Sequence, residues 1–377
     1  MPGADPRFDF FLETESQPIT SGHPAWARNL PGRRGCFSGD GQAGQEIPFT
    51  VGDYFLAARE FLDSFGPTAA AERIRIHLAK HGPHYHPARV AAEVCGRRAE
   101  LVLNVAVSEA GRACIHREYG LLQRLNREVA PSYLPAVFGL GEVALPGKPR
   151  VPMFIGEWLA GFHEFHLSRT PADSETGMVL WDPENGNRLL DRARIRAIYS
   201  GAAGILTHYF NLSTGERIGS WHHATGDFVV NLAGPRPEVR LITVRDYRPK
   251  LRPAAEAGPG LPALMESLLV FFLDTMIRMR LDRLDGVGEI AWAGPIAVEG
   301  CLEGFFSALS KKPELPGVPL PLDLLFRHYA LSCTPGHLLE LCRGLLCHFP
   351  PGSADPPVAS AFLEEHVCLV ASSLANL

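Results

Sequence analysis

The hydrophobic pattern of the chain changes its period near residue 159, and this change restricts the folds that the chain can adopt. Before that point, five short segments alternate apolar and polar residues, which predicts β-strands. The segments read AAERIRIHLA, ARVAAEV, AELVLNVAV, LPAVFGLGEVAL and VPMFIGEWLA. Between the third and the fourth, RACIHREYGLLQRLNREV has the period of an amphipathic helix. Residues 49–158 are therefore predicted to form a five-stranded sheet with a helix.

Residues 159–377 are dominated by helical periodicity, as in LLDRARIRAIYSGAAGILTHYFNL and GLPALMESLLVFFLDTMIRMRLDRL. Within them DFVVNL and EVRLITV, separated by AGPRP, predict two strands of a hairpin. The predicted class is α+β, with a β-rich amino-terminal lobe and a helical carboxy-terminal lobe that carries an embedded β-hairpin. Residues 1–48 are rich in Gly, Pro, Ser and Arg without a sustained period, which predicts a partly disordered extension.

Composition argues against several classes of partner. The formal net charge is -5, and no run of basic residues offers an electrostatic surface for nucleic acid. The most apolar stretch, LMESLLVFFLDTMI, is interrupted by Glu266 and Asp274, so we expect a buried helix and no membrane span. The 8 cysteines form no C-x-x-C pair, and the first residues lack the pattern of a secretory signal. We therefore expect reduced thiols and a cytoplasmic protein.

Three motifs, in their order along the chain, carry a resemblance to a known family. ELVLNVAV followed by HREYGLLQRL is similar to the third strand of that family and to the helix after it, which carries a glutamate. MFIGEWLAGF is similar to the hinge of that family, which presents backbone groups to adenine. SWHHATGDFVVNL with VRLITVRDY resembles a catalytic loop and the strand before a metal-binding aspartate. The chain thus resembles the protein-kinase-like superfamily, most of all its aminoglycoside and choline phosphotransferase branch. The resemblance implies a two-lobed fold and a nucleotide-binding phosphotransferase that uses ATP and Mg²⁺ on a hydroxyl of a small molecule.

The resemblance also assigns nucleotide-binding positions. Glu118 takes the place of the helix glutamate, and Asn104 takes the place of the lysine that grips the phosphates. An amide can donate a hydrogen bond to a phosphate but supplies no charge. Lys80 lies beside the predicted phosphate loop KHGPHYHP, where it is either a phosphate ligand or a solvated turn residue. Glu157 and Leu159 would lie on either side of the adenine base of the nucleotide.

The catalytic residues implied by the resemblance depend on the alignment. One alignment places Asp227 at a magnesium-binding position and His222 at the position of the base, and histidine is a competent general base. A second alignment makes Asp227 the base. For the second metal ligand, direct overlay gives Thr243, whereas a shift of three residues offers Asp246. Only the shifted register provides two carboxylates for a metal–nucleotide complex.

This chain departs from the family pattern at the positions of the phosphate-binding lysine, the glycine-rich loop, the general base and the metal-binding aspartate. These departures favour a diverged relative over an ordinary kinase. The alternative function is therefore that of a catalytically inactive pseudokinase, which binds a protein partner or a small ligand for regulation. The clustered histidines would line its cleft or, less in keeping with their spacing, bind a transition metal. GFHEFHLS is expected at the start of the first helix of the second lobe, with Glu164 reading substrate or Ser168 capping that helix.

Overall fold

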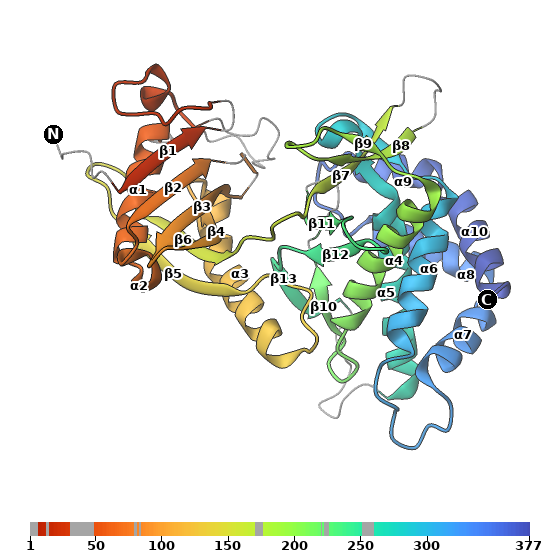
Figure 1. The fold of residues 1–377 in the computed structure, drawn as a ribbon. Coiled ribbons are helices and arrows are strands. Elements are labelled where there is room, and N and C mark those ends of the chain that lie inside the picture. The colour runs from red at the N-terminus through yellow and green to blue at the C-terminus, as the bar shows by residue number, and fades with distance from the viewer. Residues whose placement is uncertain are drawn as a thin grey trace. The chain divides into compact units, whose positions relative to one another are not determined.

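The alternating segments of the first part of the chain form one six-stranded sheet in the computed structural model, in the order β1-β2-β3-β4-β6-β5 (Figure 1). The strand β1 runs parallel to β2, and the other neighbouring strands are antiparallel. The strands are β1 (Phe8–Leu12), β2 (Arg73–Leu78), β3 (His86–Val94), β4 (Arg97–Val105), β5 (Val137–Val143) and β6 (Val151–Glu157). The accompanying helices are η1 (Pro24–Ala27), α1 (Val51–Ser64), α2 (Gly66–Ala69) and α3 (Glu109–Glu128).

The chain divides into two units, Met1–Ala160 and Gly161–Leu377, here called unit 1 and unit 2. The structure describes residues 7–12, 15–30, 49–78, 81–82, 84–169, 176–219, 221, 226–250 and 260–377. Unit 1 contains the six-stranded sheet, and unit 2 contains most of the helices. The predicted mixed α+β class, with a multi-stranded sheet and a helical part, is therefore confirmed.

Residues 1–48 were predicted to be a partly disordered extension, and part of this segment forms the strand β1. Phe8 to Leu12 pair in register with Ile74 to Leu78, and Phe8 is buried. Phe10 packs its ring 4.9 Å from that of Phe55. A run of five residues is too short to show a period, so only its pairing with β2 identifies it as a strand.

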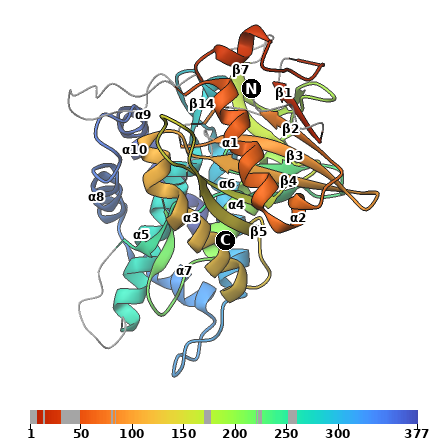
Figure 2. The same ribbon diagram turned by 90° about the vertical axis from the view of Figure 1, so that its left-hand side faces the viewer.

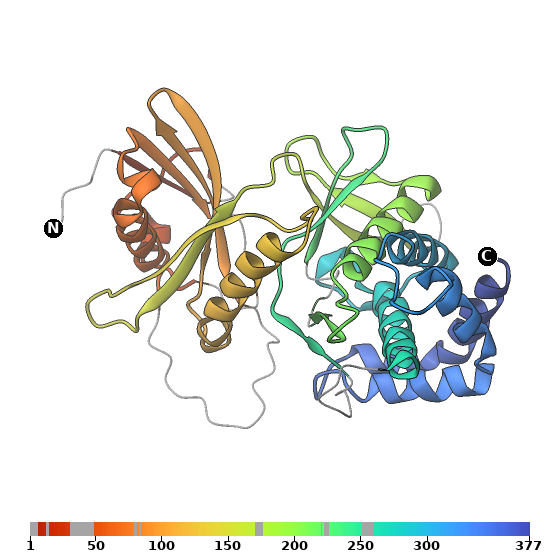
Figure 3. The ribbon, with the colours of Figure 1, turned by 90° about the horizontal axis from the view of Figure 1, so that it is seen from below.

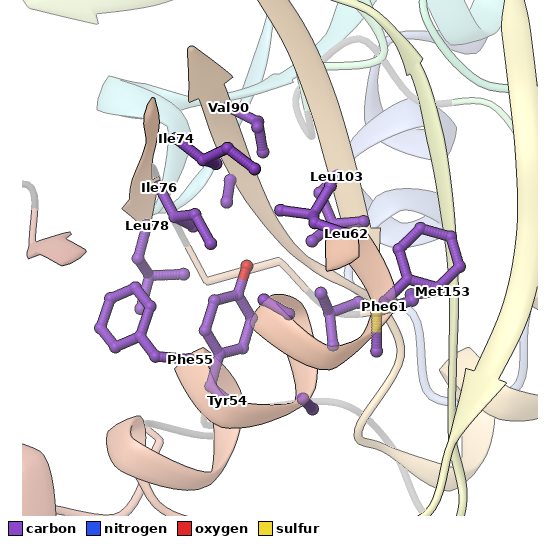
Figure 4. Packing of buried hydrophobic residues seen from close by; sticks show 14 of the residues in the cluster. Tyr54, Phe55, Phe61, Leu62, Ile74, Ile76, Leu78, Val90, Leu103 and Met153 are labelled. Atoms are coloured by element: carbon purple, nitrogen blue, oxygen red, sulfur yellow. The ribbon is translucent and has the colours of Figure 1, made fainter. Parts of the chain in front are cut away.

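One face of this sheet is covered by α1. The helix begins at Thr50, which forms a capping box with Asp53: each side chain accepts a hydrogen bond from the backbone of the other residue. Tyr54 and Phe55 of α1 point toward the apolar face of β2 (Figure 4), and the Tyr54 hydroxyl donates to the carbonyl of His86 at 2.9 Å. The helix and the strands bury a common core (Figures 2 and 4) whose members include Leu62, Ile74, Ile76, Leu78, Val90, Leu103 and Met153.

The opposite face of the sheet meets α3 at the strand β6. Side chains alternate along a strand, so Phe154 points away from the core that contains its neighbours Met153 and Ile155. The Phe154 ring lies 6.0 Å from that of Tyr119 in α3 and 6.1 Å from that of Tyr85. The two faces of the sheet therefore have different chemistry, and the candidate residues Asn104 and Glu118 belong to the α3 side.

Unit 2 is built around a group of helices, and short strands precede and separate the first of these helices along the chain (Figure 3). The helices are α4 (Arg192–His208), α5 (Leu261–Arg280), α6 (Pro295–Leu309), α7 (Leu322–Ser332), α8 (Pro335–Leu346), α9 (Asp355–Ala361) and α10 (Leu363–Ala375). The strands are β7 (Glu164–Arg169), β8 (Thr176–Trp181), β9 (Arg188–Leu189), β10 (Glu216–Gly219), β11 (Phe228–Asn231), β12 (Glu238–Leu241), β13 (Asp246–Pro249), β14 (Leu281–Arg283) and β15 (Ile290–Trp292). The predicted hairpin is present, because β11 and β12 pair antiparallel.

The segment VASAFLEEHVCLVASSL has the period of a helix throughout, but the structure divides it into α9 and α10 at Phe362. No single helix in the described residues has the length and apolar character to cross a membrane, although α9 and α10 together, bent by 64°, pass that test on length and composition alone. The cysteines that the structure describes are free thiols.

Glycines allow α4 and α6 to approach each other closely. A Cβ atom added at Gly304 of α6 would lie 1.9 Å from the carbonyl oxygen of Ser200 in α4, and one added at Gly300 would lie 2.5 Å from that of Arg196. These neighbours are backbone atoms, so they cannot turn away as a side chain could. The contact therefore requires residues without a side chain.

We predict that Gly304→Ala destabilises the protein by about 1–3 kcal/mol, because the added methyl group forces the two helices apart. Gly344→Ala in α8 is the matched control, since a Cβ there meets nothing within 4 Å. This control should be neutral or stabilise by about 0.5–1 kcal/mol, because alanine is the better helix former. Urea denaturation of both variants measures the difference, and equal stability of the two would contradict the close contact.

Candidate functional site

Asp227 lies at the start of the hairpin in unit 2, directly before β11. The antiparallel pairing of β11 and β12 extends to it, since the backbone N–H of Ile242 donates to the Asp227 carbonyl at 2.9 Å. Gly226, the preceding residue, has a φ of 70°, a left-handed conformation that glycine adopts without strain. This turn and the ladder place the buried Asp227 carboxylate beside the segment that follows β12.

Arg245, in the segment between β12 and β13, pairs with Asp227 through two hydrogen bonds. Its Nη1 lies 2.9 Å from Oδ2 of Asp227, and its Nη2 lies 2.8 Å from Oδ1. The side chain of Asp227 is 3% exposed and that of Arg245 is 16% exposed. A two-pronged pair of this kind is geometrically specific, and both carboxylate oxygens of Asp227 carry a guanidinium contact.

Asp246 and Thr243, the two alternatives for the second metal ligand, differ in their surroundings. Asp246 opens β13 opposite Gly219 of β10, and its carboxylate is paired at 2.7 Å with Arg248. Its side chain is 22% exposed, whereas Thr243 is buried. The described residues contain no group of three or more His, Cys, Asp or Glu side chains arranged to hold a metal ion.

A buried chain of charged groups leads to the turn before Asp227. Asp282, which is fully buried, lies 3.3 Å from Nδ1 of His166 and accepts the backbone N–H of Leu167 at 2.7 Å. On its other side His166 lies 3.7 Å from Glu164. A Cβ at Gly226 would lie 2.6 Å from the carboxyl carbon of Glu164, so the Glu164 side chain packs closely against this turn. The positive φ of Gly226 is the feature that favours glycine at this position.

Two carboxylates keep His166 charged. Burial alone would lower the pKa of this imidazole, but the hydrogen bond to Asp282 and the nearby carboxylate of Glu164 outweigh burial and raise its pKa to about 9. The segment that carries His166 was expected to begin a helix capped by Ser168. It forms β7 instead, paired with β8, so the expected cap is wrong.

In unit 1, Asn104 lies on β4 and faces the α3 side of the sheet. Its register partners are Pro87 on β3 and Phe154 on β6. Glu118 of α3 is buried and accepts a 2.6 Å hydrogen bond from the hydroxyl of Tyr85. The Tyr85 ring contacts Phe154, so a continuous set of side chains extends from Glu118 to the ladder neighbour of Asn104.

Arg89 of β3 lies on the same face of the sheet, because it is the register partner of Val102, two residues from Asn104. Its Nε donates to Glu100 at 2.7 Å, and its guanidinium lies 5.5 Å from the ring centre of Trp158. Trp158 lies between Glu157 and Leu159, the residues expected to frame a base. The face of the sheet that was expected to bind the nucleotide base therefore carries Arg89, whose guanidinium lies between the carboxylate of Glu100 and the indole ring of Trp158.

The backbone of this segment is partly engaged within unit 1. The N–H of Glu157 donates to Ala136 at 2.8 Å, and the N–H of Ala160 donates to the carbonyl of Trp158 at 3.1 Å. The Glu157 side chain in turn accepts the N–H of Ala136 at 3.1 Å. Glu157 thus joins the end of β6 to Ala136 through both its backbone and its side chain.

Two histidines of the predicted phosphate loop, His81 and His86, supply no charge at neutral pH. His81 and His86 share a 2.8 Å hydrogen bond between their Nδ1 atoms. Burial and the neighbouring His81 lower the pKa of His86 to about 4, and burial lowers the pKa of His81. Lys80 in this loop and the predicted base His222 lie outside the described residues, so both assignments stay predictions.

Sequence reasoning assigned no role to Arg245 and did not connect Asp282 with His166. Arg245 had a visible signal, since it stands directly before Asp246 in the motif VRDY. Only the structure shows that it turns back to Asp227 rather than supporting Asp246. Asp282 had no signal of its own, because the charged run RMRLDRLD is typical of the solvated end of a helix.

Comparison with known proteins gives remote similarities. No family model and no curated protein matches the chain. Among solved structures, WaaP in complex with acyl carrier protein is 11% identical with a TM-score of 0.31, covering 70% of this chain and 86% of that one. A microcompartment-associated aminopropanol kinase is 14% identical with a TM-score of 0.33, covering 85% of this chain and 97% of that one.

Proposed function

We propose that this chain is a kinase-like protein of the phosphotransferase type that binds a nucleotide but does not carry out ordinary magnesium-dependent phosphoryl transfer. The observation that carries the proposal is the two-pronged ion pair between Arg245 and Asp227. Support for the kinase-like part comes from the order of elements: three antiparallel strands β2, β3 and β4, a helix, two more strands, and later a hairpin in a helical unit.

The candidate metal residues do not fit a magnesium ion. Mg²⁺ requires oxygen ligands in nearly octahedral geometry and is usually held by carboxylates that face it directly. Both oxygens of Asp227 accept hydrogen bonds from Arg245, and the carboxylate of Asp246 is paired with Arg248. A guanidinium already neutralises the carboxylate on which metal binding would depend. We therefore derive no catalytic step through a metal.

Binding of the nucleotide would use the α3 side of the unit 1 sheet. Asn104 offers an amide to a phosphate, Trp158 offers an aromatic surface to a base, and Leu159 offers backbone groups. Glu118, hydrogen-bonded by Tyr85, would act by holding α3 against this face. Since the lysine of ordinary kinases is replaced by Asn104, we expect weak phosphate binding. Such a protein would regulate a partner through its nucleotide-dependent state.

A second candidate is an active phosphotransferase acting on a small hydroxyl compound, with Asp227 and Asp246 as metal ligands and His222 as base. The observation that favours it is the partial exposure of the Asp246 and Arg245 side chains, at 22% and 16%. An arginine with access to solvent could leave Asp227 when a metal–nucleotide complex arrives.

Thermal-shift titration with ATP distinguishes the two candidates. We expect ATP to raise the Tm by about 2–4 °C at saturation, equally in Mg²⁺ and in EDTA, with no phosphate transfer. Asn104→Lys should strengthen ATP binding about tenfold by adding a charged donor, whereas Ala99→Lys, an exposed position on the same strand, should not.

Other outcomes of this titration decide against the proposal. A shift that requires Mg²⁺ and disappears in Asp227→Ala would establish the active phosphotransferase. Glu238→Gln serves as the control for loss of a carboxylate, because Glu238 is exposed on the neighbouring strand β12. If no nucleotide changes the Tm, nucleotide binding is refuted, and the chain would be a kinase-like protein that binds only a partner.

A further inference from the structure

A second cluster of charges lies in unit 2 and uses none of the residues assigned above. Its centre is Asp274 of α5, surrounded by three cations from three separate segments. Lys250 Nζ and Arg278 Nε lie 3.0 Å and 3.1 Å from Oδ1 of Asp274, and Arg217 Nη2 lies 3.0 Å from Oδ2. Three positive side chains therefore share one carboxylate.

This cluster is buried and carries an excess of two positive charges. The exposed fractions of the side chains are 8% for Arg217, 19% for Lys250, 16% for Arg278 and 12% for Asp274. Burial alone would raise the pKa of Asp274, but the three cations outweigh burial and hold its pKa at about 2. Burial lowers the pKa of Lys250 and that of Arg217. An uncompensated excess of buried charge is costly, so the cluster favours an additional anion.

The donors of the cluster are oriented before any anion arrives. Nη1 of Arg217 is buried and has no hydrogen-bond partner in the described part of the chain, although the residue as a whole is 6% exposed. Its guanidinium lies 5.7 Å from the ring centre of Phe271, and that of Arg278 lies 4.1 Å from the ring centre of Phe349. These aromatic contacts fix the planes of both guanidinium groups. Lys250 and Arg278, the more exposed members, offer the approach from solvent.

We propose that Arg217, Lys250 and Arg278 bind a small phosphate-bearing anion, either inorganic phosphate or a phosphomonoester. A phosphate group carries a charge of about −1.5 to −2 at neutral pH, which matches the excess of the cluster. A carboxylate or chloride would neutralise only half of it. Guanidinium forks and an ammonium group are also the donors that proteins use for phosphate.

The test is a titration of the full chain, freed of phosphate, with inorganic phosphate and in parallel with glycerol 3-phosphate. Either compound should raise the Tm by about 2–4 °C near saturation, and sodium chloride at the same ionic strength should not. The compound with the higher affinity in calorimetry identifies the source of the phosphate group. An equal shift with chloride overturns the proposal, because it would show only general screening of charge.

Variants locate the site. Lys250→Met should fold, because it removes one charge from a cluster with excess positive charge, and it should weaken phosphate binding about tenfold. Arg194→Gln is the matched control, since Arg194 is an exposed cation on α4 paired with Asp191. Unchanged phosphate affinity in Lys250→Met, or an equal loss in Arg194→Gln, would refute the assignment. Asp227→Asn should retain the phosphate response, so the result is independent of the nucleotide proposal.

Discussion

Replacing Arg245 with methionine is expected to lower the free energy of unfolding by about 3–5 kcal/mol. The variant leaves the Asp227 carboxylate, 3% exposed, without the guanidinium that neutralises it. A buried carboxylate that loses its guanidinium loses the main interaction that offset its desolvation. Urea denaturation followed by circular dichroism at pH 7 measures this loss.

The double variant Asp227→Asn with Arg245→Met should recover most of that stability, because no buried charge remains. Arg240→Met is the matched control. Arg240 lies on β12 and pairs with Glu238, whose side chain is 55% exposed, so its loss should cost less than about 1 kcal/mol. Similar costs for Arg245→Met and Arg240→Met would contradict a buried pair and reopen Asp227 as a metal ligand.

The charged state of His166 should make stability depend on pH between about 6.5 and 9. The pKa of its imidazole is about 9 in the folded protein, against an ordinary value of 6.5. Folding therefore takes up a proton in this range, so the stabilisation is complete below pH 6.5 and is lost as the pH rises through 9. The difference corresponds to roughly 3 kcal/mol.

His166→Gln should abolish most of this dependence, because glutamine retains a donor but does not titrate. The free energy of unfolding, measured from pH 6 to pH 9.5, should then be nearly level over the interval in which that of the unaltered protein falls. His116→Gln provides the control, since His116 is 52% exposed and its contact with Glu142 is on the surface. A slope that persists in His166→Gln would show that another group is responsible.

The segment-level predictions depended on local periodicity and were largely correct. The alternation of Ile74, Ile76 and Leu78 predicted a strand with one buried face, and all three side chains are buried. The helical period of RACIHREYGLLQRLNREV predicted α3 in the same way. Where the local signal was short or shared between two structures, prediction was wrong: β1 is too short to show a period, and β7 was taken for a helix start.

The partners of charged residues were harder to predict from the sequence than the helices and strands. Asp274 was noted only as an interruption of an apolar helix, yet it is the shared partner of Arg217, Lys250 and Arg278. One of these, Arg278, stands four residues later on the same helix and could be anticipated. The other two come from segments 57 and 24 residues earlier in the chain, and no local pattern connects them to α5.

The amino-acid sequence by itself determined the type and order of the helices and strands, because hydrophobic period is a property of neighbouring residues. This holds for the longer elements and does not hold for the short strands β1 and β7. The sequence also determined which side chains were available for chemistry, including an asparagine in place of a lysine at residue 104. Only the tertiary structure decided that Arg245 pairs with Asp227 and that three cations share Asp274. Such pairings depend on distance and burial between residues far apart in the chain, and these quantities exist only once the chain has folded.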